Sequence, residues 1–543
     1  MQRPAIAFYL TILASALASH GVAGAADEVE TKQANTSLAA TGWVAKTLPE
    51  IAAALQSGEL TSEEITSLYL ERIARIDRSG PTLQAILTVN PDALAQARAA
   101  DKSRKSGKIL GPLHGVPVLL KDNIETKDAM PTTAGALALK DNVTGRDSPL
   151  AAGLRASGAI ILGKTNLSQW ANFRSSDSMS GWSALGGQVS NPHMLDRNPC
   201  GSSSGSGSAA AASLAAGAVG TETNGSIICP SSVNGVVGFK PSIGLVSQRY
   251  IIPISAAQDT AGPMTKTVTG AAMMLNAMAT GAAKTDYVTG LNRDSLKNAR
   301  IGVMRFTEAS SADTKMLFDS ALKDLEAAGA TLIDIKEFEP SISDFRDKNR
   351  MALRYEFKAG LNDYLKNAAK SVQVRDLDEL IAFNLEHADI ELSLFDQSIF
   401  EASASTGELT DEVYVAARRD VNKAVREDGI DALLKTYDVD VLLTHSGIAA
   451  SRIDPVHGDV WPRRGSGGWL AAIAGYPHIT VPMGDVHGLP VGLSFMAAMD
   501  EDTKVLSFGY AYEQLTQHRV EPQFLKSAED RPEIGEAMKR REN

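Results

Sequence analysis

Apolar and polar residues along this chain follow two alternating periodicities, one typical of buried strands and one of amphipathic helices. Thr61 begins a helix with Glu64 three residues later, which is a capping-box pattern, and apolar residues keep helical spacing over 65–76. Short apolar runs bounded by glycine, proline or charged residues predict buried strands at 116–120 and 159–162.

The alternation continues through the second half of the chain. It predicts strands at 301–304, 331–335, 439–443, 479–482 and 491–495, and helices at 313–328 and 503–516. Strands that alternate with helices throughout indicate one α/β sheet covered by helices on both faces, in a single large domain over 46–525. Residues 342–431 carry no strand signal and many charges, so we expect helices there that pack on the core and wall a substrate cleft.

Residues 200–226 break these patterns with the sequence CGSSSGSGSAAAASLAAGAVGTETNGS. Composition alone describes the first half as a flexible Gly/Ser linker. The run nevertheless continues into small residues that can pack as a tight helix, with 209–219 as a spacer, and it ends in a second polar turn at 221–226. Two serine-bearing turns held apart by a compact helix can present two hydroxyl groups to one point. A hydroxyl becomes a good nucleophile only when a neighbour takes its proton.

Composition excludes some classes of partner. The chain has 543 residues, of which 44% are hydrophobic and 22% charged, and its formal net charge is −11. Nucleic acids and anionic membranes both require a concentrated basic face, so we expect neither as a partner. No segment reaches the roughly 18 uninterrupted apolar residues of a membrane-spanning helix.

The N-terminus has the pattern of a secretory signal peptide. Arg3 precedes an apolar run over 5–18, and the small residues Ala23, Gly24 and Ala25 follow it. We therefore expect a cleaved signal peptide at 1–25, a connector at 26–45 and a charged tail at 526–543. The expected location is the periplasm or the outside of the cell.

The two cysteines, Cys200 and Cys229, stand beside the two serine turns. An oxidising compartment permits a bridge between them. The sequence does not show that their Cβ atoms meet, so two buried free thiols are the slightly favoured expectation.

Two familiar motifs match in letters only. Residues 158–165, GAIILGKT, fit a phosphate-binding loop, but AIIL belongs in a buried strand rather than in a loop whose N–H groups point at phosphate. Residues 201–205, GSSSG, fit a nucleophile elbow, but the preceding SNPHMLDRNPC is polar and interrupted by proline. None of the nine histidines has metal-ligand spacing, so neither a metal site nor a Ser-His-Asp triad has support.

Without a histidine base, the next candidate is a lysine held neutral. Lys121 follows the apolar run HGVPVLL and precedes Asp122. Such a run can carry the ammonium group into poorly solvated surroundings, which lowers the pKa of a lysine. From these residues alone, a charged group that caps a strand end is the favoured alternative.

Six segments in order resemble the amidase signature family. They are GPLHGVPVLLKDN (111–123), GAIILGKTN (158–166), the Ser/Gly block, TNGSIICPSSVNGVVGFKPSIGLVS (223–247), DTAGPMTKTV (259–268) and AGYPHITVP…GLPVGLSFM (474–496). The resemblance covers roughly residues 48–517. It implies the fold of that family, a central mixed β-sheet covered by helices on both faces, and an enzyme without a cofactor or metal.

The resemblance also implies a Ser–cis-Ser–Lys triad. Ser226 matches the nucleophile, Ser202 the bridging cis-serine and Lys121 the base. Backbone N–H groups of four residues would form the oxyanion hole: Thr223, Asn224, Gly225 and Ser226.

Some residues depart from the pattern of the family. Cys200 and Ser204 replace glycines, Asn224 replaces a glycine of the oxyanion loop, and Ile228 replaces an arginine two positions after the nucleophile. The missing arginine argues against a small anionic substrate. The strings SQWANFRS, GWSALGGQ and NPCGSSSGSG are most similar to the branch that contains bacterial peptide amidases.

The expected activity is hydrolysis of carboxamides to carboxylate and ammonia through an acyl-serine, with C-terminally amidated peptides as substrates of a monomeric enzyme. An aryl or fatty acyl amidase, or an esterase, with the same triad is one alternative. A periplasmic solute-binding protein without catalysis is an alternative of another class, because a fold by itself does not prove catalysis.

Overall fold

The computed structural model describes residues 38–282, 284–308, 311–460 and 466–540. The chain divides into two compact units, Met1–Ala39 and Ala40–Asn543, and the second holds the elements discussed below. The expected signal peptide lies outside the described residues.

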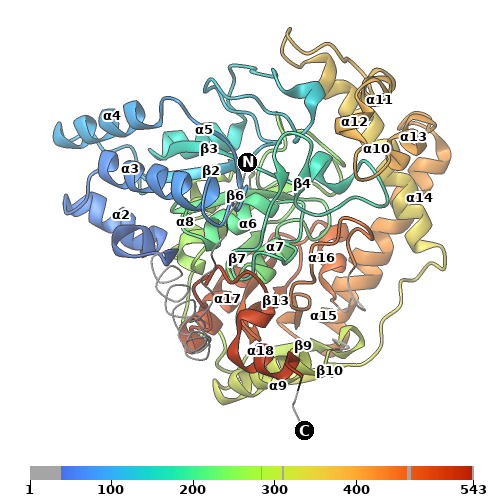
Figure 1. Cartoon of the computed structure of the whole chain (residues 1–543). Coiled ribbons are helices and arrows are strands. Elements are labelled where there is room, and N and C mark those ends of the chain that lie inside the picture. Colours follow the sequence, from blue (N-terminus) through green and yellow to red (C-terminus); the bar gives the residue numbers. More distant parts are fainter. Residues whose placement is uncertain (1–37, 283, 309–310, 461–465, 541–543) are drawn as a thin grey trace, which may run out of the picture. The chain divides into compact units, whose positions relative to one another are not determined.

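A mixed sheet of eleven strands forms the centre of the described chain (Figure 1). In spatial order the strands are β1 (Ile86–Val89), β3 (Ile160–Thr165), β2 (Pro117–Lys121), β6 (Gly217–Glu222), β8 (Thr260–Thr265), β7 (Val237–Lys240), β12 (His478–Val486), β13 (Leu489–Met496), β11 (Val441–His445), β9 (Arg300–Met304) and β10 (Thr331–Ile335). The fold is therefore the single α/β architecture that the sequence predicts.

Strand β2 lies between β3 and β6 and is parallel to both. Val118 of β2 faces Gly217 of β6 in the register, and Leu120 faces Val219. The carboxyl ends of parallel strands meet at one edge of a sheet, which is where α/β proteins place their sites. Lys121 and Thr221 consequently lie side by side at that edge.

The predicted strands are present with small shifts at their ends, and the two predicted helices of the second half are α9 (Ala312–Ala327) and α17 (Asp502–Thr516). The N-cap of α3 (Ser62–Arg72) is Thr61, whose side chain accepts a hydrogen bond from the backbone N–H of Glu64. The sequence analysis did not predict β1, β6, β7 or β8. Strands β1 and β7 have only 4 residues each, and β6 and β8 are rich in glycine and threonine.

The segment that resembles a linker is packed inside the protein. Helix α6 (Ser204–Ala211) is buried along its whole length, and it leads into β6. The expected spacer at 209–219 is therefore the end of a helix and the start of a strand. A Cβ atom on Gly205 would lie 2.4 Å from the carbonyl oxygens of both Ala85 and Asn166, so this helix approaches neighbouring backbone too closely for any side chain.

Residues 342–431 fold into helices beside the sheet, coloured yellow to orange in Figure 1. They are α10 (Phe345–Lys366), α11 (Leu377–Glu386), α12 (Ala388–Glu391), α13 (Ser398–Ala404), α14 (Glu412–Val425) and the π-helical turn η6 (Arg426–Ile430). Phe357 of α10 and Phe400 of α13 pack in one apolar cluster with Trp170. This cluster ties the helical segment to the loop that precedes the serine block.

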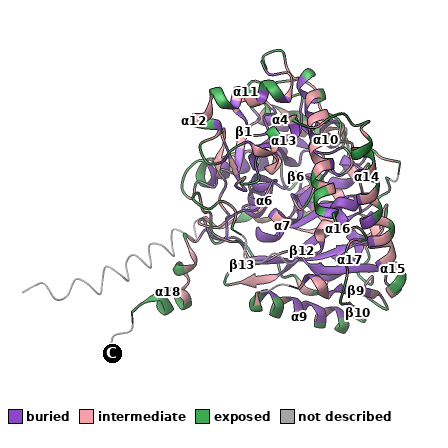
Figure 2. Cartoon of the chain, turned by 90° about the vertical axis from the view of Figure 1, so that its right-hand side faces the viewer, coloured by how far each residue is buried: buried purple, intermediate pink, exposed green. Residues whose placement is uncertain are grey.

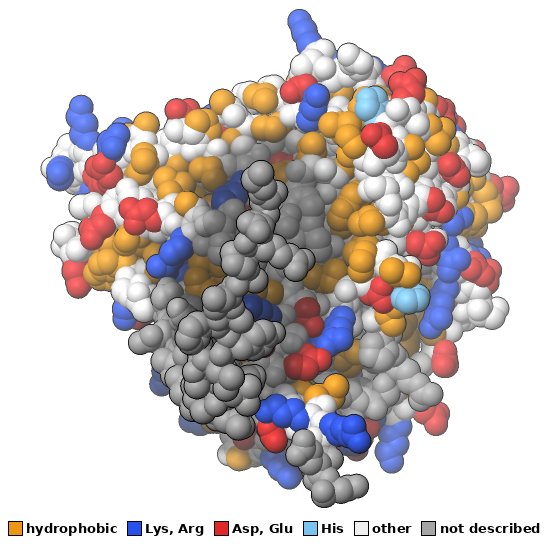
Figure 3. All heavy atoms as spheres, viewed as in Figure 1, with side chains coloured by type: hydrophobic (Ala, Val, Ile, Leu, Met, Phe, Trp, Pro, Cys, Tyr) orange, Lys and Arg blue, Asp and Glu red, His pale blue; other side chains and the backbone are white. Residues whose placement is uncertain are grey.

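Buried residues concentrate on the strands and on the inner helices, whereas the outer faces of α9 and α18 (Pro532–Met538) are exposed (Figure 2). On the face drawn in Figure 3, acidic and basic side chains are interspersed. Among the described residues, no helix is long and apolar enough to cross a membrane.

The run that fits a phosphate-binding loop in letters forms strand β3. Its Lys164 is fully buried and pairs with Asp122 at 3.4 Å. Lys164 Nζ also donates to the carbonyl oxygen of Ile124 and to Thr132 Oγ1. The buried strand that the sequence predicts is therefore present, and protein acceptors surround the ammonium group of Lys164.

Candidate active site

Lys121 is the last residue of β2 and has no exposed surface. Its Nζ lies 2.8 Å from Ser202 Oγ and 2.8 Å from Thr221 Oγ1, and 3.3 Å from the carbonyl oxygen of Thr221. The apolar run before Lys121 fills the core as the strand interior, and the chain delivers the amine to the edge of the sheet. The sequence analysis considered a buried amine at this position but did not foresee its contacts with Thr221.

Burial lowers the pKa of Lys121 to about 7, and the negative charges of Asp259 and Glu222 oppose the shift. The dominant cause is the loss of hydration, which disfavours the ammonium form. A large fraction of this lysine is thus neutral near pH 7. A neutral amine can donate two N–H bonds to Thr221 and accept the proton of the Ser202 hydroxyl with its lone pair.

Ser202 follows a cis peptide bond with Gly201 and is fully buried. Its carbonyl oxygen accepts a hydrogen bond from the backbone N–H of Ser168 at 3.1 Å. A Cβ atom on Gly201 would lie 2.1 Å from Ser168 Oγ, so any side chain before the serine would displace the hydroxyl of Ser168.

Ser226 lies in the turn that follows β6. The backbone N–H of Ser203 donates to the carbonyl oxygen of Ser226 at 3.1 Å, which joins the two serine turns directly. Gly225 has a φ of +81°, a conformation that glycine adopts without strain. Among the described residues, no hydrogen bond joins the side chains of Ser202 and Ser226, so the Lys121–Ser202 contact is the part of the predicted relay that is formed.

Glu222 fixes the turn that carries Ser226, and the sequence analysis missed it. Its Oε2 accepts hydrogen bonds from the backbone N–H groups of Ile227 at 2.8 Å and Ile228 at 3.0 Å. The side chain is buried. A carboxylate within a Gly/Thr/Ser turn is the signal that could have indicated this role.

The backbone N–H groups of Thr223, Asn224, Gly225 and Ser226 donate to no acceptor within the part of the chain that the structure describes. The side chain of Thr223 is fixed by a hydrogen bond, because its Oγ1 donates to Asp259 Oδ1 at 2.6 Å. Burial raises the pKa of Asp259 to about 6. The turn therefore presents free donors beside Ser226, as an oxyanion hole requires.

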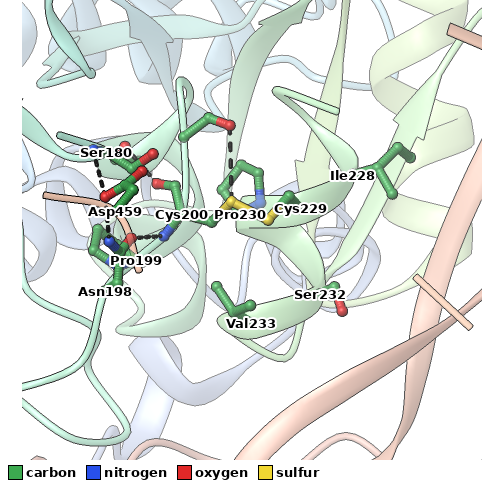
Figure 4. The surroundings of a disulfide bond; sticks show 12 residues. Ser180, Asn198, Pro199, Cys200, Ile228, Cys229, Pro230, Ser232, Val233 and Asp459 are labelled. Atoms are coloured by element: carbon green, nitrogen blue, oxygen red, sulfur yellow. Dashed lines mark hydrogen bonds between the residues drawn. A yellow bond between two sulfur atoms is a disulfide. The ribbon is translucent and has the colours of Figure 1, made fainter. Parts of the chain in front are cut away.

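Cys200 and Cys229 form a disulfide bond, with their Cα atoms 5.9 Å apart (Figure 4). The favoured expectation of two free thiols is therefore wrong. The fold brings the residue before Gly201–Ser202 against helix α7 (Ile228–Val233), which begins two residues after Ser226. Spacing along the sequence contains no information on this approach.

A cavity of about 760 Å³ opens onto both serine turns. Gly201, Ser226 and the two cysteines line it on one side, and Phe173, Ile254 and Leu353 give it an apolar wall. Many other lining residues carry charge or hydrogen-bonding groups, among them Asn172, Asp177, Glu222, Arg346, His457, Asp459 and His478. The volume suits a small molecule or a short peptide.

The α/β fold, the buried lysine and the serine turns at a cavity together define a hydrolase. The family model described as amidase matches residues 64–506, so the chain belongs to the amidase signature family and is an amidase acting on C–N amide bonds.

Similar proteins agree with this assignment. The chain is 44% identical to a peptide amidase solved with the competitive inhibitor chymostatin (TM-score 0.84, covering 88% of this chain and 99% of the other). It is 43% identical to the native peptide amidase of Stenotrophomonas maltophilia (TM-score 0.83, 88% and 98%). A probable amidase of Arabidopsis thaliana is 38% identical, with 88% of this chain and 91% of the relative covered. A solute-binding protein without catalysis is no longer an alternative.

Proposed function

We propose that this amidase removes the C-terminal amide of short peptides, with Ser226 as the nucleophile, Ser202 as the proton relay and neutral Lys121 as the base. The observation that carries the proposal is the contact of 2.8 Å between Lys121 Nζ and Ser202 Oγ, two side chains without exposed surface. The likeness to peptide amidases supports the substrate class.

In the proposed reaction Lys121 takes the proton of Ser202, Ser202 takes that of Ser226, and Ser226 Oγ attacks the amide carbonyl carbon. The negative charge on the carbonyl oxygen meets the N–H groups of 223–226. Removal of one such donor in other enzymes costs about 100–1000-fold in rate. The relayed proton returns to the amide nitrogen, the C–N bond breaks and ammonia leaves. Water then hydrolyses the Ser226 ester to the peptide carboxylate.

The lining of the cavity favours a peptide substrate over a small anion. Ile228, which stands where the family has arginine, is buried and lines the cavity. The apolar wall of Phe173, Ile254 and Leu353 offers contact to a side chain of the substrate.

We also propose that the enzyme is exported to the periplasm. The signal-peptide pattern at 1–25 motivates this, and a disulfide bond is the chemistry of an oxidising compartment. Cell fractionation checks it: the protein is expected in the periplasmic fraction, starting at or near Ala26. Full-length protein in the cytoplasm contradicts it.

The function is tested with an amidated dipeptide, by measuring released ammonia, and with an organophosphonate, by locating the label with mass spectrometry. Label on Ser226, and loss of turnover in Ser226→Ala, Ser202→Ala and Lys121→Ala, are expected. Label on another residue, or near-normal turnover of the variants, would exclude the proposed triad. Aryl amides, fatty acyl amides and esters are assayed alongside, and faster turnover of any of these overturns the substrate class.

A further inference from the structure

A carboxylate of the cavity wall is held in a fixed orientation. Asp459 Oδ1 accepts hydrogen bonds from the backbone N–H of Ser180 at 3.0 Å and from Asn198 Nδ2 at 2.8 Å. Figure 4 shows this group beside the disulfide, with the second carboxylate oxygen turned away from Asn198. The carboxylate is thus oriented before any substrate arrives.

The same network ties Asp459 to the catalytic turns. Asn198 Oδ1 accepts a hydrogen bond from the backbone N–H of Cys200 at 2.8 Å. Cys200 precedes Gly201–Ser202, and its disulfide leads to Cys229 beside the Ser226 turn. Hydrogen bonds and a covalent bond therefore connect the loop of Asp459 to the turn of Ser226.

Within the described ranges, no hydrogen bond or ion pair engages the second oxygen of Asp459, Oδ2, so among those residues it is open to a ligand. The neighbouring His457 pairs with Asp454 at 2.8 Å instead. Of the other charged groups on the wall, Asp177 reinforces the negative potential; its carbonyl oxygen lies near Gly458. Arg346 is the cation among these wall residues and belongs to helix α10. Its neighbour Phe345 packs against Trp469, another residue of the cavity lining.

We propose that Asp459 binds the free N-terminal ammonium group of the substrate and so selects short peptide amides with an unblocked N-terminus. The inference rests on the proposed function and names the substrate more closely. The C-terminus of a peptide amide carries no charge, so the α-ammonium is the one charge that its backbone offers. A preoriented carboxylate meets it with a charge-assisted hydrogen bond.

The variant Asp459→Asn separates this role from a structural one. The asparagine keeps an oxygen for Ser180 and Asn198 and removes only the charge. The probes are glycyl-phenylalaninamide and its N-acetyl derivative, which differ in the ammonium group. We expect kcat/KM for the free amine to fall about 10–100-fold, mainly through KM, and the loss for the acetylated probe to be far smaller. Equal losses for the two probes overturn the proposal.

Asp177→Asn is the matched control, because it removes a charge from the same wall at an exposed position. Because Asp177 adds only negative potential to the wall, Asp177→Asn is expected to lower kcat/KM for the free amine by a much smaller factor than Asp459→Asn. A selective loss equal to that of Asp459→Asn overturns a specific role of Asp459. In wild type, kcat/KM for the free amine should decline above about pH 8, where an α-amino group loses its proton, while the acetylated probe shows no such decline. A decline in both probes contradicts the proposal.

Binding to Ser226→Ala, measured by calorimetry, tests the inference apart from catalysis. The free amine should bind about 10–100-fold more tightly than the acetylated probe, and the difference should vanish when Asp459→Asn is added. Selective binding without hydrolysis by wild type refutes the proposed function alone. Hydrolysis of both probes without selective binding refutes the role of Asp459 alone.

Discussion

Lys121 Nζ and Ser202 Oγ lie 2.8 Å apart, although the two residues are separated by 81 positions and neither side chain has exposed surface. The contact joins the end of a central strand to a turn that follows a cis peptide bond. Burial lowers the pKa of the lysine without an acidic partner in direct contact, so the amine can act as a base near neutral pH.

The pH dependence of catalysis should follow Lys121. The protonated amine cannot accept the proton of Ser202, so kcat/KM on a neutral, N-acetylated peptide amide should rise with pH through a midpoint near 7 and level off above it. The profile is measured by ammonia release with a stopped assay. A rate that still climbs above about pH 10 would show an ordinary solvated lysine.

Glu222→Gln should shift that midpoint downward. The negative charge of Glu222 raises the pKa of Lys121, and a glutamine removes it while keeping an oxygen for the N–H groups of Ile227 and Ile228. The same profile is recorded for Glu222→Ala, which also removes the acceptor and should lose far more activity at every pH. An upward shift in Glu222→Gln contradicts the electrostatic coupling.

Loss of the disulfide should destabilise the protein. The bond closes a loop of 29 residues, for which chain entropy gives a stabilisation of about 3–4 kcal/mol. The double variant Cys200→Ser/Cys229→Ser should lose about that much unfolding free energy in urea denaturation. The unfolding free energy of wild type treated with a reductant should fall toward that of the double variant. If the oxidised wild type and the double variant unfold at the same urea concentration, the bond contributes nothing.

Lys164→Met should be strongly destabilising although Lys164 takes no part in the proposed reaction. It leaves the fully buried Asp122 without its cation, and removal of one partner from such a pair costs about 3–5 kcal/mol. Combining it with Asp122→Asn should restore part of the loss, since the uncompensated charge is gone. The urea midpoints of Lys164→Met, Asp122→Asn and the double variant check this order of stabilities. A double variant that is less stable than Lys164→Met contradicts the prediction.

The sequence predicted those parts of the fold that depend on local pattern. Apolar runs located β2, β3 and the later strands. The run before Lys121 allowed a buried amine, but only the resemblance to the amidase signature family favoured it over a charged group that caps a strand end. Strand β6 was not predicted because GAVGTE has two glycines and one branched apolar residue, Val219, so it lacks the apolar run of a typical buried strand. Its position comes from pairing with β2 and β8, which lie far away in the sequence. The Cys200–Cys229 bond was not predicted for the same reason, since it depends on an approach that only the folded chain sets. The contacts of Glu222 are local, and they were missed because the side chain was not considered as an acceptor for the N–H groups of its own turn.

The close approach of Gly205 to two backbone carbonyls has a consequence for protein engineering. Low-complexity sequence is commonly chosen as a site for insertions, tags or random libraries, because it reads as expendable. Here even the gain of one methyl group at Gly205 would collide with Ala85 and Asn166, so the most repetitive stretch of this enzyme should tolerate the least variation. Libraries aimed at new substrates belong instead on the apolar wall formed by Phe173, Ile254 and Leu353.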